Sequence, residues 1–162
     1  MYVVSQEFAS PVQCAFMLLT NLTIQEEGQK HFLGDGKTKG AILENIFGMF
    51  NYFKTNTTFD FVSNIMANVS SLAAGRRFII ENNMLGQILD IVLDKANCNE
   101  HRRKHLLATL RNVCFEYEDY EIDFTKVDLA DKLIKLFVQE QGIAMLPTEW
   151  EHLQGTAPKE LY

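Results

Sequence analysis

Leu18-Leu19-Thr20-Asn21-Leu22-Thr23 is the first of three related stretches that decide the fold of this chain. The pattern returns as Ile65-Met66-Ala67-Asn68-Val69-Ser70 and again as Thr109-Leu110-Arg111-Asn112-Val113-Cys114. The three asparagines are 47 and 44 residues apart, and each lies between hydrophobic neighbours near the end of an apolar segment. This recurrence indicates a structural unit that the chain repeats.

The residues that flank the asparagines keep the same spacing. Gly28 follows Asn21 by seven residues, as Gly75 follows Asn68, and an apolar cluster comes after each glycine. Repeats of about 40–47 residues are the spacing of armadillo and HEAT solenoids, in which each repeat has two or three helices. We therefore expect an all-α superhelix of armadillo- or HEAT-like repeats, with at least two three-helix repeats plus partial ones.

Local signals divide the chain into helices. Ser10-Pro11, with Gln13 three residues after the serine, predicts a capped helix start. Asn97 with Glu100 predicts a second capping box, and Thr148 with Glu151 predicts a third. Apolar residues at helical spacing, without the alternation of a strand, predict the helices 10–23, 25–33, 41–53, 59–70, 72–81, 84–93, 99–115 and 129–138. The acidic and aromatic residues 116–123 have no clear period, so we expect a loop there.

These signals give a domain plan. We expect a lead-in over residues 1–9, a repeat domain over 10–155 with repeats ending near 23, 70 and 115, and a tail over 156–162. Solenoid ends normally carry polar capping repeats, and neither end of this chain shows one. We therefore expect a fragment of a longer protein. In isolation, it should either self-associate through an uncapped end, with the N-terminal end favoured, or need flanking sequence to stay soluble and monomeric.

Composition excludes several classes. The net charge of −6 and pI of about 5.2 disfavour a general nucleic-acid binder. The longest apolar run near the N-terminus is too short to span a bilayer. Three widely spaced cysteines fit a reducing compartment better than a disulfide framework. We expect a cytoplasmic protein with no membrane and no nucleic-acid partner.

Catalytic and metal-binding patterns are absent from the sequence. It contains no G-x-S-x-G, no H-E-x-x-H and no phosphate loop, which predicts a non-enzymatic protein without cofactors. Cys98, His101 and His105 have types that bind zinc, and the histidines share a helix face. However, the basic run 102–104 between them adds positive charge and no fourth ligand is evident, so we expect no metal and a solvated helix start.

The repeat asparagines allow two interpretations. In peptide-binding armadillo proteins, such residues bond the backbone of an extended ligand. Alternatively, each asparagine bonds the inter-helix loop of its own repeat and satisfies buried backbone groups. Nuclear-import grooves also need a tryptophan one helical turn before each asparagine. Those positions are Met17, Asn64 and Ala108, so a groove of the import type is disfavoured.

One stretch is more specific than the repeat. Leu110-Arg111-Asn112-Val113-Cys114-Phe115-Glu116 resembles the signature of a eukaryotic armadillo-like family of chaperone adaptors, known as brain-protein-sixteen-like proteins and formerly as a conserved domain of unknown function. Residues 19–23, 66–70 and 145–153 resemble further segments of that family. The resemblance implies a cytosolic adaptor that assists folding of translation elongation factor two, with that client and cytosolic chaperones as partners. The alternative is an armadillo-type peptide-binding scaffold of trafficking or degradation.

One charged run is a further candidate for a protein-binding surface. The acidic run 116–123 holds two tyrosines, and aromatic side chains are enriched where partners bind. A run of this kind is either solvated surface or a docking patch whose charge steers association. The candidate protein-binding residues are Asn21, Asn68, Asn112, Arg111, Tyr117 and Tyr120.

Overall fold

The computed structural model describes residues 10–36 and 39–141 of the chain. The expected lead-in, the capping box at 148–151 and the expected tail lie outside the described residues. The chain divides into two compact units, and the boundary in the sequence falls between Val127 and Asp128.

The described residues are helical, and they contain no strand, which confirms the all-α prediction for this part of the chain. None of their helices is long and apolar enough to cross a membrane. The first unit contains α1 (Pro11–Leu22), α2 (Glu26–Leu33), α3 (Ala41–Tyr52), α4 (Phe61–Val69), α5 (Ala73–Glu81), α6 (Met84–Leu93), α7 (Glu100–Val113) and α8 (Tyr117–Lys126), with short 3₁₀ turns η2 (Thr57–Phe59) and η3 (Cys114–Glu116). The described part of the second unit is α9 (Leu129–Gln141), which extends past the helix predicted at 129–138.

Two helix starts show how local chemistry sets the boundaries. The Ser10 hydroxyl accepts a hydrogen bond of 3.1 Å from the Gln13 backbone N–H, and Pro11 occupies the first turn, as predicted. The predicted cap of α7 at Asn97 is wrong, because Asn99 caps that helix by accepting from the Arg102 backbone N–H at 2.9 Å. Asn97 instead donates to the Asp94 carboxylate at 2.8 Å and closes the preceding turn.

The loop predicted over residues 116–123 is also wrong. The chain forms α8 there, with Glu118 and Asp119 in its first turn, where the helix dipole favours negative charge. A kink at Tyr120, with φ −129° and ψ 28°, interrupts the helix. Phe124 is the buried residue of this helix, so the apolar periodicity that marks the other helices is too weak to detect.

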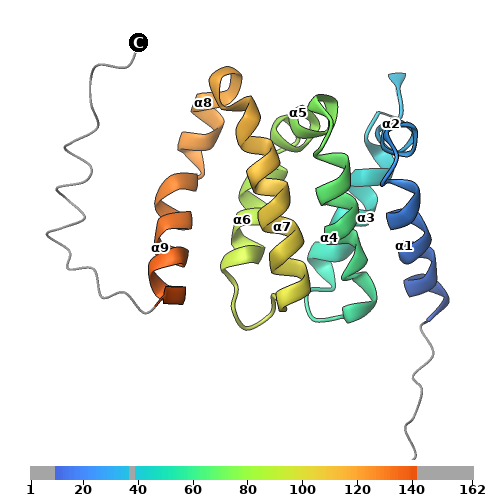
Figure 1. Ribbon diagram of the computed structural model, residues 1–162, viewed down its shortest axis with the longest axis horizontal. Helices are drawn as coiled ribbons and strands as arrows, with labels where there is room; N and C mark the ends of the chain where they lie inside the picture. Colours follow the sequence, from blue (N-terminus) through green and yellow to red (C-terminus); the bar gives the residue numbers. More distant parts are fainter. Residues whose placement is uncertain (1–9, 37–38, 142–162) are drawn as a thin grey trace, which may run out of the picture. The chain divides into compact units, whose positions relative to one another are not determined.

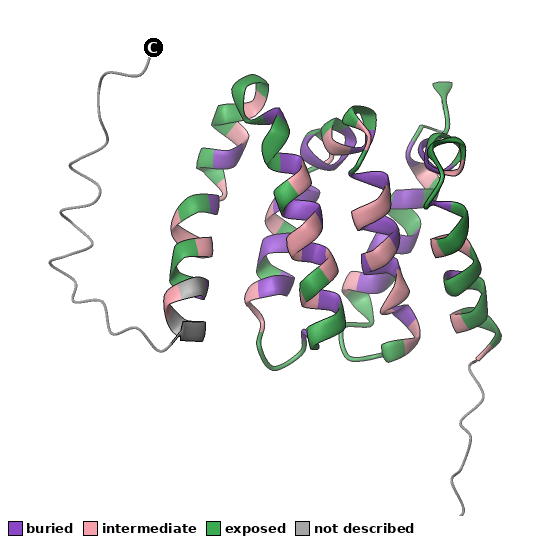
Figure 2. Ribbon diagram, in the orientation of Figure 1, coloured by how far each residue is buried: buried purple, intermediate pink, exposed green. Residues whose placement is uncertain are grey.

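The helices of the first unit pack as a recurring set. Figure 1 shows α1, α4 and α7 side by side, and contacts join α1 to α4 and α4 to α7. Helices α2 and α3 pack against each other and against α4, and α5 and α6 pack in the same way against α7. Figure 2 places the buried residues between these helices. The most buried side chains come from all of the inner elements, among them Leu43, Val62, Ile65, Ile79, Ile88, Leu89 and Leu106.

Gly28 and Gly75 allow one helix to start directly against the end of the helix before it. A Cβ built on Gly28 would lie 1.9 Å from the Leu22 carbonyl oxygen, and one on Gly75 would lie 2.1 Å from the Val69 carbonyl oxygen. No side chain fits at such a distance. The start of α2 therefore lies directly on the end of α1, and the start of α5 lies directly on the end of α4.

Candidate protein-binding surface

The repeat asparagines join neighbouring helices. Asn68 on α4 donates through Nδ2 to the Thr20 carbonyl oxygen and to the Thr23 hydroxyl, both at 3.1 Å. Asn112 on α7 makes the same pair of bonds one set further on. It donates to the Ala67 carbonyl oxygen at 3.4 Å and to the Ser70 hydroxyl at 3.1 Å.

These bonds decide what the asparagines can do. An amide nitrogen has two hydrogens, and each Nδ2 already donates to two acceptors, so Asn68 and Asn112 have no further donor to offer a ligand. The interpretation in which each asparagine bonds the inter-helix loop of its own repeat is wrong, because the acceptors lie at the end of α1 for Asn68 and at the end of α4 for Asn112. Asn21 is exposed on α1, and Arg111 is exposed beside Asn112, whose side-chain oxygen accepts from it at 3.3 Å.

A second set of side-chain bonds between helices also occurs twice, and the sequence analysis did not predict it. Gln29 on α2 donates to the Thr23 carbonyl oxygen at 2.9 Å and accepts from the Ser71 hydroxyl at 3.0 Å. Arg76 on α5 donates to the Ser71 carbonyl oxygen at 2.9 Å and pairs with the Glu116 carboxylate at 2.8 Å. Gln29 and Arg76 are 47 residues apart, so the repeat spacing was the signal that could have found them.

Glu116 is the buried carboxylate of this linkage. Arg77 donates to its other oxygen at 3.0 Å, so two guanidinium groups hold it. The hydrogen bond from Arg77, followed by that from Arg76, lowers the pKa of Glu116 although desolvation opposes the shift. The carboxylate is therefore charged at neutral pH and fixes η3 against α5.

Two histidines meet one amide between α4 and α7. His101 Nε2 lies 2.6 Å from Asn64 Oδ1, and Asn64 Nδ2 lies 2.9 Å from His105 Nε2. Burial, followed by the neighbouring His105, lowers the pKa of His101. No group of three or more histidine, cysteine, aspartate or glutamate side chains among the described residues is arranged to hold a metal ion.

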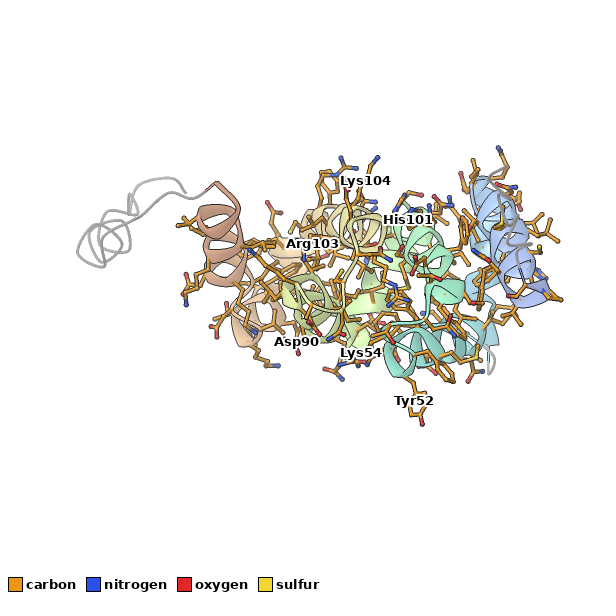
Figure 3. All side chains as sticks on the ribbon, turned by 90° about the horizontal axis from the view of Figure 1, so that it is seen from below. Tyr52, Lys54, Asp90, His101, Arg103 and Lys104 are labelled. Atoms are coloured by element: carbon orange, nitrogen blue, oxygen red, sulfur yellow. The ribbon has the colours of Figure 1, made fainter. Side chains whose placement is uncertain are left out.

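The basic run 102–104 is not uniformly solvated, which corrects the expectation for Arg102. This side chain is 2% exposed and lies over the Phe50 ring at 4.7 Å. It pairs with the Asp60 carboxylate at 2.5 Å and donates to the backbone carbonyls of Lys54 and Asn56. Figure 3 shows Lys104 and His101 on one side of the unit, and Tyr52 and Lys54 on the opposite side. Arg102 therefore belongs to the core that joins α7 to the α3–α4 connection.

The aromatic–acidic segment, which we define as residues 114–123 of η3 and α8, is the most exposed apolar part of the candidate surface. Phe115 is 76% exposed and Tyr117 is 49% exposed, with the Arg76 guanidinium 5.8 Å from the Phe115 ring centre. The Tyr117 hydroxyl donates to Glu121 of its own helix at 3.4 Å. The Tyr120 hydroxyl instead donates to the Glu81 carboxylate of α5 at 2.7 Å, and this bond raises the pKa of Tyr120.

Comparison with known proteins identifies the family. The family model described as "Domain of unknown function (DUF383)" matches residues 4–140. This chain belongs to the DUF383 family. Among curated proteins and among solved structures, nothing matches the chain.

The predicted site residues of this DUF383 chain fall into separate places. Arg111 and Asn112 lie at the end of α7, next to η3 and the tyrosines of α8, whereas Asn21 lies on α1 and Asn68 lies between α1 and α4. Phe115 was missed as a candidate. The signal was available, because this aromatic residue stands between the end of a helix and an acidic run.

Proposed function

We propose that this chain is a non-enzymatic protein-binding adaptor built as an armadillo-like superhelix. The recurring linkages support the repeat architecture. The asparagine bonds, the Gln29 and Arg76 linkages, and the close approaches at Gly28 and Gly75 each occur twice, at the spacing of the sequence repeat. Stacking of identical units with a constant offset produces a solenoid.

The exposed aromatic residues of the aromatic–acidic segment carry the proposal for binding. Phe115 and Tyr117 are large side chains at the protein surface, and Ile122 on the same segment is 70% exposed. Aromatic residues are enriched in the centres of protein interfaces, and charge around them steers association. Glu118 and Asp119 supply exposed negative charge beside them. The segment therefore fits a protein partner with an apolar contact surface and a basic rim.

The resemblance of residues 110–116 to the chaperone-adaptor family supports a specific client. On that basis we propose a eukaryotic, cytoplasmic adaptor that assists folding of translation elongation factor two together with cytosolic chaperones. The peptide-binding alternative has less support, because Asn68 and Asn112 already donate both amide hydrogens within the chain.

A binding experiment with matched variants tests the proposal. The full chain and its Phe115→Ala/Tyr117→Ala variant would be immobilised and incubated with purified translation elongation factor two, and separately with eukaryotic cytosol for quantitative mass spectrometry. We expect the factor and cytosolic chaperonin to be enriched by the full chain, and the variant to bind the factor roughly tenfold more weakly.

The control is Tyr52→Ala. Tyr52 is 81% exposed and lies on α3, outside the aromatic–acidic segment, so its removal should leave binding unchanged. If the purified factor does not bind the full chain, the proposed client is wrong. If the factor binds and both variants bind it equally well, the proposed surface is wrong.

A further inference from the structure

The outer face of α1 exposes large apolar side chains. Leu18 is 60% exposed, Leu22 is 53% exposed and Met17 is 42% exposed. They share one helix face with Asn21, because residues three and four apart are neighbours on a helix surface. The sequence of α1 contains no charged residue. Phe16, in contrast, is 5% exposed and its ring lies 5.5 Å from that of Phe59, so the opposite side of α1 is the side that packs within the unit.

The repeat register shows what covers the same face on α4. Leu18 and Leu22 correspond to Ile65 and Val69, which are 0% exposed. Asn21 corresponds to Asn68, whose amide donates to the Thr20 carbonyl oxygen and the Thr23 hydroxyl. Helix α4 contacts α1, α2 and α3. Helices α1 and α4 therefore carry the same apolar face with its asparagine. The described residues cover this face on α4 but leave it exposed on α1.

We propose that the outer face of α1 binds an amphipathic helix of a partner protein, placed against α1 as α1 is placed against α4. The last turn of that helix presents two acceptors to Asn21, a backbone carbonyl oxygen and a serine or threonine hydroxyl three residues later. This acceptor pair is the one that Asn68 uses at Thr20 and Thr23 and that Asn112 uses at Ala67 and Ser70.

The packing of α1, α4 and α7 and the absence of charge on α1 define the partner. The docked helix continues the row in which α1 contacts α4 and α4 contacts α7. Because α1 carries no charge, a partner face with lysine, arginine or carboxylate side chains would lose their hydration without gaining an ion pair. The partner face is therefore apolar and uncharged. This inference is independent of the proposed adaptor function, whose surface lies on η3 and α8.

A peptide provides the probe. A synthetic peptide of residues 10–25, labelled with fluorescein and carrying added lysines at its N-terminus for solubility, contains the acceptor pair of Thr20 and Thr23. Binding to the full chain would be followed by fluorescence anisotropy. We expect saturable binding that Leu18→Glu in the chain weakens at least tenfold, and that Asn21→Ala weakens roughly three- to tenfold, the effect of one or two lost hydrogen bonds. Thr23→Val in the peptide should weaken binding to a similar degree.

Controls make each outcome decisive. Tyr52→Glu places the same charge at a residue that is 81% exposed on α3, and it should leave binding unchanged. Absence of saturable binding would overturn the proposal. Binding that survives Leu18→Glu and Asn21→Ala would also overturn it, since the peptide would then have displaced α1 from α4. Analytical ultracentrifugation of the chain adds a third arm: a dimer that Leu18→Glu dissociates would assign the face to a second copy, against the proposed partner.

Discussion

The junction between α4 and α5 and the junction between α7 and α8 occupy equivalent places in the repeat, yet they are built differently. At the first, Gly75 lets the start of α5 lie against the Val69 carbonyl oxygen. At the second, the position seven residues after Asn112 is Asp119. There the chain continues from α7 through η3 into α8, which is kinked at Tyr120.

The difference shows that two kinds of interaction can join a helix to the helices that precede it. A glycine allows direct contact between a helix start and the preceding carbonyl, and the link beside it is the neutral pair of Gln29 and Ser71. Asp119 has a Cβ that excludes the same approach. The link beside that junction is ionic, with Glu116 held by Arg76 and Arg77. Close packing joins the helices at the first junction, and charge pairing joins them at the second.

The largest effect is expected at the glycine of the tight junction. Gly75→Ala places a Cβ 2.1 Å from the Val69 carbonyl oxygen, so α5 must move away from α4. We expect the free energy of unfolding to fall by about 3 kcal/mol, the upper range for overpacking. Urea denaturation measures it. Gly48→Ala is the control, because nothing lies within 4 Å of its added Cβ, and it should raise stability by roughly 0.5–1 kcal/mol. Equal effects at both glycines would remove the steric explanation.

The second-largest loss of stability is expected when the asparagine that joins α4 to α1 is removed. Asn68→Ala leaves the Thr20 carbonyl oxygen and the Thr23 hydroxyl without this donor at a site where Thr23 is fully buried. We expect a loss of about 1–3 kcal/mol in thermal or urea unfolding. Asn21→Ala, at the equivalent exposed position, should change stability by less than about 0.5 kcal/mol. A loss at Asn21 as large as that at Asn68 would show that the two positions are equally enclosed.

The ionic link should respond to pH. The pKa of Glu116 is lowered in the folded protein, so its contribution is complete above the unfolded pKa of about 4.3 and is lost as pH falls through the folded pKa. Glu116→Gln should cost about 1–2 kcal/mol at pH 7, less than removal of the whole side chain. Unfolding of both proteins between pH 7 and pH 3 should show this difference shrink at the acidic end. A difference that stays constant with pH would contradict the charge pairing.

The neutral link should have the smallest effect. Ser71→Ala removes the hydroxyl that donates to Gln29 Oε1 at an exposed position. We expect a loss of about 0.5–1 kcal/mol in urea denaturation at pH 7. Because neither partner titrates in this range, the loss should not change between pH 7 and pH 4. A pH-dependent loss would show that the two links do not differ in the way that their residues indicate.

The repeat itself was readable from the sequence because it depends on residue types with narrow physical roles. Asparagines 47 and 44 residues apart marked the inter-helix bonds, and glycine seven residues after the first two marked the tight junctions. The Ser10-Pro11 cap was equally local and was predicted correctly. In contrast, the cap of α7 was placed at Asn97, because Asn97 has Glu100 three residues later and so completes a capping box, whereas Asn99 has Arg102 there. The turn that Asn97 makes with Asp94 excludes it from the cap position.

The candidate surface was less predictable. Tyr117 and Tyr120 belong to one acidic run, yet Tyr117 is exposed whereas Tyr120 donates to Glu81 on another helix. No sequence rule separates them, since the separation arises from the kink in α8. The same holds for Arg102, which stands in a basic run and is the most deeply buried charged residue among the described residues.

What the sequence by itself determined is the all-α class, the repeat period and the positions that recur in it, because helical periodicity and special residues act over short distances. The tertiary structure alone decided which partner each recurring residue meets. Asn68 bonds the end of α1, Glu116 pairs with two arginines of α5, and Leu18 stays exposed where Ile65 is buried. The reason is physical: a residue's type limits the interactions it can make, but its partners come from helices about 40 residues away in the chain, and only packing brings them within bonding distance.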